Sequence, residues 1–149
     1  MFRGISNLSL DAKGRFAVPT RYRDDLSAQC GGSLILTVSA DDPCLAIYPL
    51  PVWLDIERQL DALPGTNRKA TRIKRLLIGH ATEVSLDASG RLLVPPELRD
   101  YAALDKGAVL VGQGKKFELW DEGSWRKTMY AEGGEDEGEG PEALELIAL

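Results

Sequence analysis

The amino-acid sequence predicts an α+β fold in which two homologous β-β-α-β-β halves, related by a pseudo-twofold axis, are joined by helices. The first observation is an internal repeat: "SLDAKGRFAVPTRYRD" begins at Ser9 and "SLDASGRLLVPPELRD" begins at Ser85, with ten identities in sixteen positions. The second is the alternation of apolar and polar residues around both copies, which is typical of strands. The third is the separation of 76 residues between only two copies, which is too long for a solenoid and indicates one domain built from two halves.

The first half is expected to span residues 1–50. Apolar residues alternate with polar ones on both sides of a glycine-containing turn: Leu8 and Leu10 before it, Phe16 and Val18 after it. This pattern predicts a β-hairpin. Pro19 then ends the strand and suits the first turn of a short helix, because proline has no N–H to lose there. Two more strands are expected at residues 33–38 and 44–49.

The remainder of the chain divides into a linker, a second half and a tail. Residues 51–79 are expected to form a helical linker, with two helices separated by Pro64-Gly65. The second half, residues 80–130, repeats the order of the first and ends in a helix. Residues 131–149 are rich in Gly and Glu and are predicted to be a disordered acidic tail, because they cannot bury enough apolar surface.

The charge is unevenly distributed along the chain. The net charge is −5, but residues 131–149 hold seven of the 23 acidic residues and none of the 18 basic ones. Residues 1–130 therefore carry 18 basic and 16 acidic residues, a net charge of +2. The body is compatible with a polyanionic partner, while the tail is either solubilising or competes with such a partner.

The sequence lacks the residues that several classes of function need. Cys30 and Cys44 form no CxxC motif, so we expect no metal and no cofactor. The single histidine, His80, has no GxSxG motif to accompany it, and "GQGKK" at residues 112–116 matches no phosphate-binding loop. No segment has the apolar length of a membrane span, and the N-terminal segment lacks the apolar run of a signal peptide. We therefore predict a cytoplasmic protein that is not an enzyme, with no small-molecule substrate and no membrane partner.

The repeated DxxGR loops are the candidate site. They comprise Asp11, Gly14 and Arg15 in the first copy and Asp87, Gly90 and Arg91 in the second. The aspartates and glycines are predicted to shape the loops, because Asp caps turns and Gly adopts positive φ. An arginine could simply pair with the aspartate, but at an exposed tip beside Lys13 it suits phosphate or the O6 and N7 edge of guanine. We therefore predict that Arg15, Arg91 and Lys13 bind DNA.

Six segments together resemble the MraZ family of bacterial transcriptional regulators, whose halves are related to SpoVT/AbrB-like DNA-binding domains. They are "MFRG", the two "SLDxxGR…VP" copies, "YPLPVW", "RLLIGHA" and "VGQGKKFELWD". The resemblance covers residues 1–130, and the family's DxxxR signature falls on Asp11 to Arg15 and on Asp87 to Arg91.

The resemblance implies a particular assembly and target. The hairpins of the two halves would interlock in an AbrB-like swapped-hairpin β-barrel, and subunits would form a homo-oligomeric ring. The ring would bind short direct repeats in double-stranded DNA upstream of its own gene, at the head of a division and cell-wall gene cluster. The protein would then be associated with the nucleoid.

The sequence leaves other classes of function open. Related domains also serve as antitoxins, but the C-terminal segment lacks the long amphipathic stripe that would wrap a toxin groove. A hydrolase using Asp11 or Asp87 would need a histidine or metal cluster nearby. The basic residues of the linker form a solvated face, subunit contacts or auxiliary phosphate contacts: Arg68, Lys69, Arg72, Lys74 and Arg75.

Overall fold

Both copies of the repeat fold into the same order of elements. The structure is a computed structural model that describes residues 1–131 and 140–148. The first copy forms β1 (Phe2–Ser9), β2 (Arg15–Ala17), α1 (Thr20–Cys30), β3 (Ser33–Val38) and β4 (Leu45–Pro49). The second forms β5 (Thr82–Ser85), β6 (Arg91–Leu93), α4 (Pro96–Tyr101), β7 (Gly107–Gly114) and β8 (Phe117–Asp121). The predicted β-β-α-β-β order is therefore confirmed in both halves.

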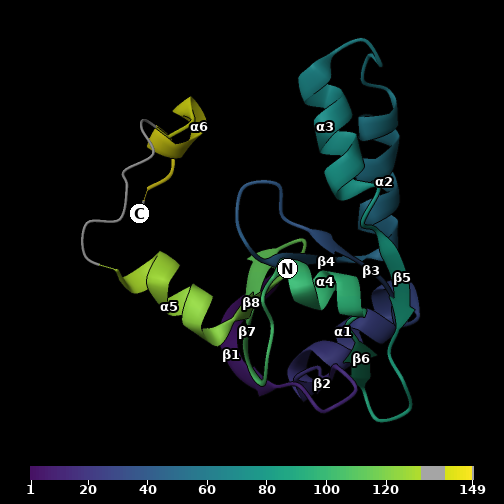
Figure 1. Ribbon diagram of the computed structural model, residues 1–149, viewed down its shortest axis with the longest axis vertical. Coiled ribbons are helices and arrows are strands. Elements are labelled where there is room, and N and C mark those ends of the chain that lie inside the picture. Colours follow the sequence, from purple (N-terminus) through teal and green to yellow (C-terminus); the bar gives the residue numbers. More distant parts are fainter. Residues whose placement is uncertain (132–139, 149) are drawn as a thin grey trace.

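Three helices outside this repeat lie where the sequence predicts them: α2 (Leu50–Asp61), α3 (Arg68–Leu77) and α5 (Glu122–Tyr130). A further short helix, α6 (Glu142–Glu145), was not predicted and lies in the segment for which the sequence predicts disorder. The α2–α3 pair projects from one end of the molecule (Figure 1). Asn67 caps α3 by accepting the backbone N–H of Ala70 at 3.0 Å. Of the predicted disordered tail, residues 132–139 and 149 lie outside the described residues.

The strands of the two halves pair with each other. The main sheet has six strands in the order β1-β7-β8-β4-β3-β5, and its pairs are antiparallel. At one edge β1 of the first half lies on β7 of the second, and at the other edge β5 of the second half lies on β3 of the first. The two halves therefore share one sheet.

A separate two-stranded ribbon, β2–β6, takes one strand from each half. The sequence predicts that β1 and β2 form a local hairpin, and this is corrected: the turn is kept, but β1 pairs with β7 and β2 pairs with β6. A closed barrel is not confirmed. The pairings among the described residues give an open sheet and the ribbon.

The ribbon is anchored in a core to which both halves contribute. Phe16 lies opposite Leu92 at the centre of the ribbon, and each is 1% exposed. The core continues through Val18, Val94, Leu34, Leu36, Leu110, Phe117 and Leu119. Arg15 and Arg91 therefore lie on a ribbon whose opposite face is fully buried in the core.

The remaining residues with reactive side chains have structural environments. Burial raises the pKa of the Cys44 thiol to about 12, which keeps it protonated. Cys30 is half-buried and its Sγ donates to the Leu26 carbonyl at 3.1 Å. A ring nitrogen of His80 lies 2.7 Å from the Leu76 carbonyl oxygen. Of the helices within the described residues, none has the length and apolar character needed to cross a membrane.

Candidate nucleic-acid interface

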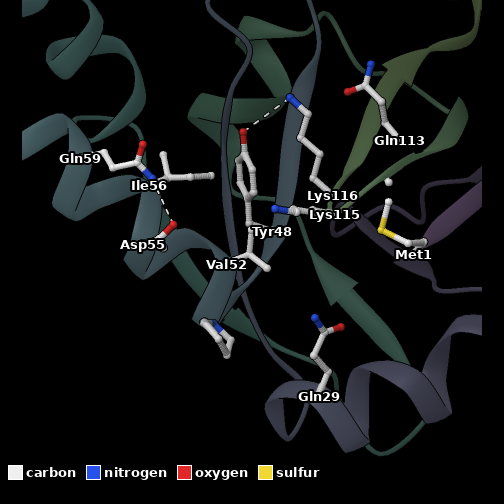
Figure 2. Close-up of a pocket in the computed structure, with 12 residues that line it drawn as sticks. Met1, Gln29, Tyr48, Val52, Asp55, Ile56, Gln59, Gln113, Lys115 and Lys116 are labelled. Carbon is white, nitrogen blue, oxygen red and sulfur yellow. Dashed lines mark hydrogen bonds between the residues drawn. The ribbon is translucent and has the colours of Figure 1, made fainter. Parts of the chain in front are cut away.

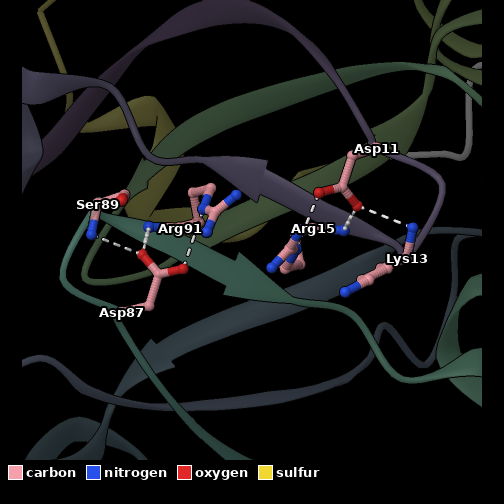
Figure 3. A network of polar contacts seen from close by, with 6 residues as sticks. All are labelled: Asp11, Lys13, Arg15, Asp87, Ser89 and Arg91. Carbon is pink, nitrogen blue, oxygen red and sulfur yellow. Dashed lines mark hydrogen bonds and ion pairs between the residues drawn. The ribbon is translucent and has the colours of Figure 1, made fainter.

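Each DxxGR turn is closed by its aspartate. Asp11 Oδ1 accepts the backbone N–H groups of Lys13 and Arg15, both at 2.9 Å. Asp87 Oδ1 accepts those of Ser89 and Arg91 at 2.9 and 2.8 Å. The two loops therefore have the same hydrogen bonds (Figure 3), and the predicted turn-capping role of the aspartates agrees with this geometry.

The glycines of the two loops cannot be replaced without strain. Gly14 has φ 86° and Gly90 has φ 74°, a region that L side chains rarely adopt. A Cβ at Gly14 would also lie 2.7 Å from Arg99 Nε and Cζ, and one at Gly90 would lie 2.4 Å from Arg23 Nε. The positive φ therefore favours glycine at these positions, and a side chain there would also displace the arginine of the other half.

The two predicted DNA-binding arginines share one face of the ribbon. Arg15 lies opposite Leu93, and Arg91 is two residues from Leu93, so the arginines are diagonal neighbours on the outer face. Such neighbours have Cα atoms about 7–8 Å apart. Because the ribbon is centred on the Phe16–Leu92 pair, the arginines are placed symmetrically about it.

Each arginine side chain is hydrogen-bonded through its Nε, and its two Nη groups, unbonded among the described residues, remain available to a ligand. Arg15 Nε donates to Asp11 Oδ2 at 2.8 Å, and Arg91 Nε donates to Asp87 Oδ2 at 3.0 Å. The side chains are 29% and 37% exposed. Within residues 1–131 and 140–148 their hydrogen bonds use Nε, which leaves the Nη groups for a ligand. The aspartate thus orients the guanidinium group, whose Nη donors can still bind a ligand in a bidentate way.

Lys13 makes the two loops unequal. It occupies the position of Ser89 in the repeat and is exposed at the tip of the first loop. The structure brings it beside Arg15, as Figure 3 shows, so the first loop carries one more cation than the second.

Sequence reasoning missed a second pair of arginines, Arg23 and Arg99. Arg23 Nε donates to the Val18 carbonyl at 2.7 Å, and Arg99 Nε donates to the Val94 carbonyl at 3.1 Å. Each side chain packs against the glycine of the other half's loop. Their recurrence among the ten identities of the repeat was the signal that could have identified them.

The backbone also joins each loop to the opposite half. The Val18 N–H donates to the Gly90 carbonyl at 2.9 Å, and the Val94 N–H donates to the Gly14 carbonyl at 2.9 Å. These two bonds extend the ribbon beyond its paired strands. The position of each arginine is therefore set by both halves, so the two arginines belong to one structural unit.

The loop hydrogen bonds shift the acidity of the aspartates. Donation from the Arg15 backbone N–H is the largest cause that lowers the pKa of Asp11, and the Arg91 N–H acts in the same way on Asp87. The arginine side chains add to the effect. Both carboxyl groups are therefore ionised at every pH at which an ordinary aspartate is ionised.

We expect the loops to be insensitive to pH between about 5 and 8 and to loosen only in stronger acid. Because the pKa of each carboxyl is lower in the folded protein than in the unfolded chain, its stabilisation is complete above the usual value of about 3.9 and is lost as pH falls through the lowered value. NMR titration of the Lys13 and Ser89 amides measures this. Titration at or above the usual aspartate pKa would contradict it, and in Asp11→Asn only the Ser89 amide should still respond.

A surface groove elsewhere offers little for catalysis. It measures about 750 Å³ and lies between α2 and the β7–β8 turn (Figure 2). Lys116 Nζ lies 3.5 Å from the Tyr48 hydroxyl there, and Val52 and Ile56 supply apolar surface. Its lining residues include no histidine, cysteine, serine or threonine and a single carboxylate, Asp55. Among the described residues, no cluster of three potential metal ligands occurs.

Together these features define a two-repeat α+β protein whose halves share a sheet and present a paired-arginine loop site. Comparison with known proteins finds the same division of the chain into two parts. The family model described as "MraZ protein, putative antitoxin-like" matches residues 1–76 and again residues 77–136. The chain belongs to the MraZ family.

Three relatives, each named Transcriptional regulator MraZ, illustrate the similarity. The protein of Halorhodospira halophila is 53% identical over 152 residues, which cover 100% of both chains. That of Pseudomonas putida is 56% identical over 132 residues, covering 89% of this chain and 87% of the relative. That of Thioalkalivibrio sulfidiphilus is 58% identical over 128 residues, covering 86% and 85%. The family resemblance inferred from the sequence is thereby confirmed.

Proposed function

We propose that this protein is a sequence-specific DNA-binding transcriptional regulator, without enzymatic activity, that contacts duplex DNA through its two DxxGR loops. The observation that carries the proposal is the placement of Arg15 and Arg91 on one outer face of the β2–β6 ribbon, with their Nη groups unused by the described residues. The regulatory part is supported by the names of the relatives.

The geometry favours base or phosphate recognition over a purely structural role. A turn can be closed by Asp and Gly alone, as the backbone bonds to Asp11 and Asp87 illustrate. The aspartates also orient the guanidinium groups, and an oriented Arg fork suits the O6 and N7 atoms of guanine or a phosphate. Two forks related by a pseudo-twofold axis suit a duplex, whose strands are also related by twofold symmetry.

The wider arrangement follows from the family resemblance. We propose that residues 1–50 and 80–130 act as two halves of a swapped-hairpin unit with residues 51–79 as its linker. Copies of the unit would form a ring that binds short direct repeats upstream of its own gene, in the cytoplasm at the nucleoid. Strand exchange between the halves supports the first of these statements.

The test is a competition titration with two duplexes at one salt concentration. One duplex comes from upstream of the protein's own gene, and the other is a shuffled sequence of equal length and composition. Specific regulators bind their sites about 10³-fold or more tightly than random DNA. Equal affinity for the two duplexes would overturn the proposed function.

Lys13→Ala is expected to weaken DNA binding without changing sequence preference. Lys13 lies beside Arg15 and has no counterpart in the second loop, which fits a phosphate contact. Its loss should reduce the slope of log K against log salt by about 0.9. The measurement is a salt series on the upstream and shuffled duplexes, with Ser89→Ala as the matched control. A change in the ratio of the two affinities would instead assign Lys13 to base recognition.

Inserting about five base pairs between two neighbouring direct repeats is expected to abolish most of the gain from binding both. One helical turn is about 10–10.5 base pairs, so a half-turn insertion moves the second repeat to the far side of the duplex. Contacts made by neighbouring subunits would then lose their high effective concentration. The affinity of both duplexes is measured by titration, with a full-turn insertion as control. If the half-turn insertion has no effect, the repeats are read independently.

A toxin-binding role receives less support from the structure. Such partners require a long amphipathic segment, and in the C-terminal stretch that is described, residues 140–148, the helix α6 has four residues. Leu144 in this helix is 49% exposed, and Leu146 just after it is 87% exposed. Co-expression with a candidate toxin therefore serves as a secondary test.

A further inference from the structure

One face of α3 carries four exposed cations, which we call the α3 strip: Arg68, Lys69, Arg72 and Arg75. No acidic residue occurs in the sequence between Asp61 and Glu83. Among the described residues, the ion pairs involve other arginines, and the neighbouring Lys74 donates to the Leu63 carbonyl at 3.0 Å. The strip is therefore a concentrated positive surface without a neutralising partner in the described part of the chain.

This arrangement opposes the stability of the helix that carries it. Arg68 and Arg72 are four residues apart and Arg72 and Arg75 are three apart, so like charges face each other along the helix. Arg68 and Lys69 also occupy the first turn, where the helix dipole disfavours cations, and that turn contains no acidic residue. No residue of α3 is fully buried. The Asn67 cap and the place of Arg75 in the last turn offset part of this cost. The repulsion that remains breaks a local rule, as functional surfaces often do.

We propose that the α3 strip binds the phosphate backbone of duplex DNA, as a second surface that does not read sequence. The choice of DNA as the polyanion rests on the proposed function. Residues 1–130 carry a net charge of +2, so without the four strip residues they would carry −2. The body therefore has a small positive excess, and four of its 18 basic residues are gathered on this one helix face.

The dimensions of the strip suit a duplex. Residues 68 and 75 are seven apart, which is about 10.5 Å along a helix. Duplex DNA carries one negative charge per about 1.7 Å of its axis, so about six phosphate charges fall within that length. Three of the four cations are arginines, whose planar forks match phosphate oxygens.

The strip and the DxxGR loops lie at opposite ends of the molecule. In Figure 1 the α2–α3 pair stands at one end of the long axis, and β2 and β6 stand at the other. The two surfaces therefore do not adjoin on the subunit. The strip engages a separate stretch of DNA, and its contribution is separable from that of Arg15 and Arg91.

The experiment compares two variants that each remove two exposed helical arginines. Arg68→Gln/Arg72→Gln alters the strip, and Arg58→Gln/Arg126→Gln alters two arginines that are ion-paired with Asp55 and Glu122 and are 75% and 72% exposed. Binding to a random duplex is measured over a salt series in the Arg15→Ala/Arg91→Ala background. The strip variant should lower the slope of log K against log salt by about 1.8, and the control should leave it unchanged.

Sequence preference separates this proposal from the proposed function. With Arg15 and Arg91 intact, the strip variant should keep the wild-type ratio of affinities for the upstream and shuffled duplexes. Equal slopes for the strip and control variants would overturn the strip proposal and leave the loops untouched. A wild-type protein without sequence preference would overturn the proposed function and leave the strip result standing.

The acidic C-terminal segment is the competing occupant of the strip. In a full-length protein, the seven acidic residues of 132–145 are replaced by Gln or Asn, and the two slopes are measured again. The proposal requires the difference between strip and control variants with both the native and the neutral tail. A difference seen only with the neutral tail would assign the strip to the tail and overturn the proposal.

Discussion

Replacing Arg15 or Arg91 by alanine is expected to weaken binding to the DNA upstream of the protein's own gene by about 1–3 kcal/mol for each arginine, roughly 5- to 150-fold. The physical reason is the loss of a guanidinium fork that an aspartate already orients, by bonds of 2.8 Å for Arg15 and 3.0 Å for Arg91. Titration at constant salt measures the change, and the shuffled duplex should be affected much less.

The fold should survive both substitutions. Asp11 keeps its bonds to the backbone N–H groups of Lys13 and residue 15, because these do not involve the arginine side chain. Arg126→Ala is the matched control, since it removes an exposed arginine that is ion-paired with Glu122. A variant that binds the upstream duplex as tightly as wild type would show that its arginine only supports the turn. The double variant is not expected to be additive, because both side chains lie on one ribbon.

Phe16→Ala is expected to lower the free energy of unfolding by about 3–5 kcal/mol, the cost of removing a fully buried aromatic side chain. Phe16 is 1% exposed and lies opposite Leu92 on the face of the ribbon that points away from the arginines. The ribbon has only three residue pairs among the described residues, and a two-stranded ribbon of this length is barely stable by itself. Its stability therefore depends on the contact between Phe16 and the core. Chemical denaturation measures the loss.

Ala17→Ser provides the comparison on the other face of the same strand. Ala17 is exposed and pairs with Arg91, so its change should stay within about 0.5 kcal/mol. If the two variants unfolded alike, the ribbon would not be anchored in the core. The fixed position of the ribbon beneath the arginines would then need another explanation.

The order of elements was predictable because it depends on local pattern. The strand predicted at residues 33–38 matches β3 residue for residue, since its apolar run is bounded by glycine and polar residues. The helix after Pro19 is longer than predicted and continues to Cys30. It ends at Gly31, whose φ of 62° and N–H bond to the Ser27 carbonyl form a glycine C-cap. That signal was present in the sequence as Gly31-Gly32.

The pairing of the strands was not predictable from the residues alone. Alternation around Phe16 and Val18 tells which side chains face the core, but it does not tell which strand lies alongside. The same limit applies to Arg23 and Arg99: their recurrence in the repeat was visible, while their contact with the loop of the opposite half exists only in the folded chain. Helical spacing likewise places Met129 four residues from Trp125 on one face of α5, yet Trp125 is buried and Met129 is 54% exposed.

Recognition through the two loops is tested most directly by a footprint on the DNA upstream of the protein's own gene, made with wild type and with Arg15→Ala/Arg91→Ala at equal salt. We expect the wild type to protect several short repeated boxes. We expect the double variant, shown to be folded by circular dichroism, to protect none at the same concentration. Protection that persists unchanged in the double variant, or wild-type protection without any repeated box, would contradict recognition through the two loops.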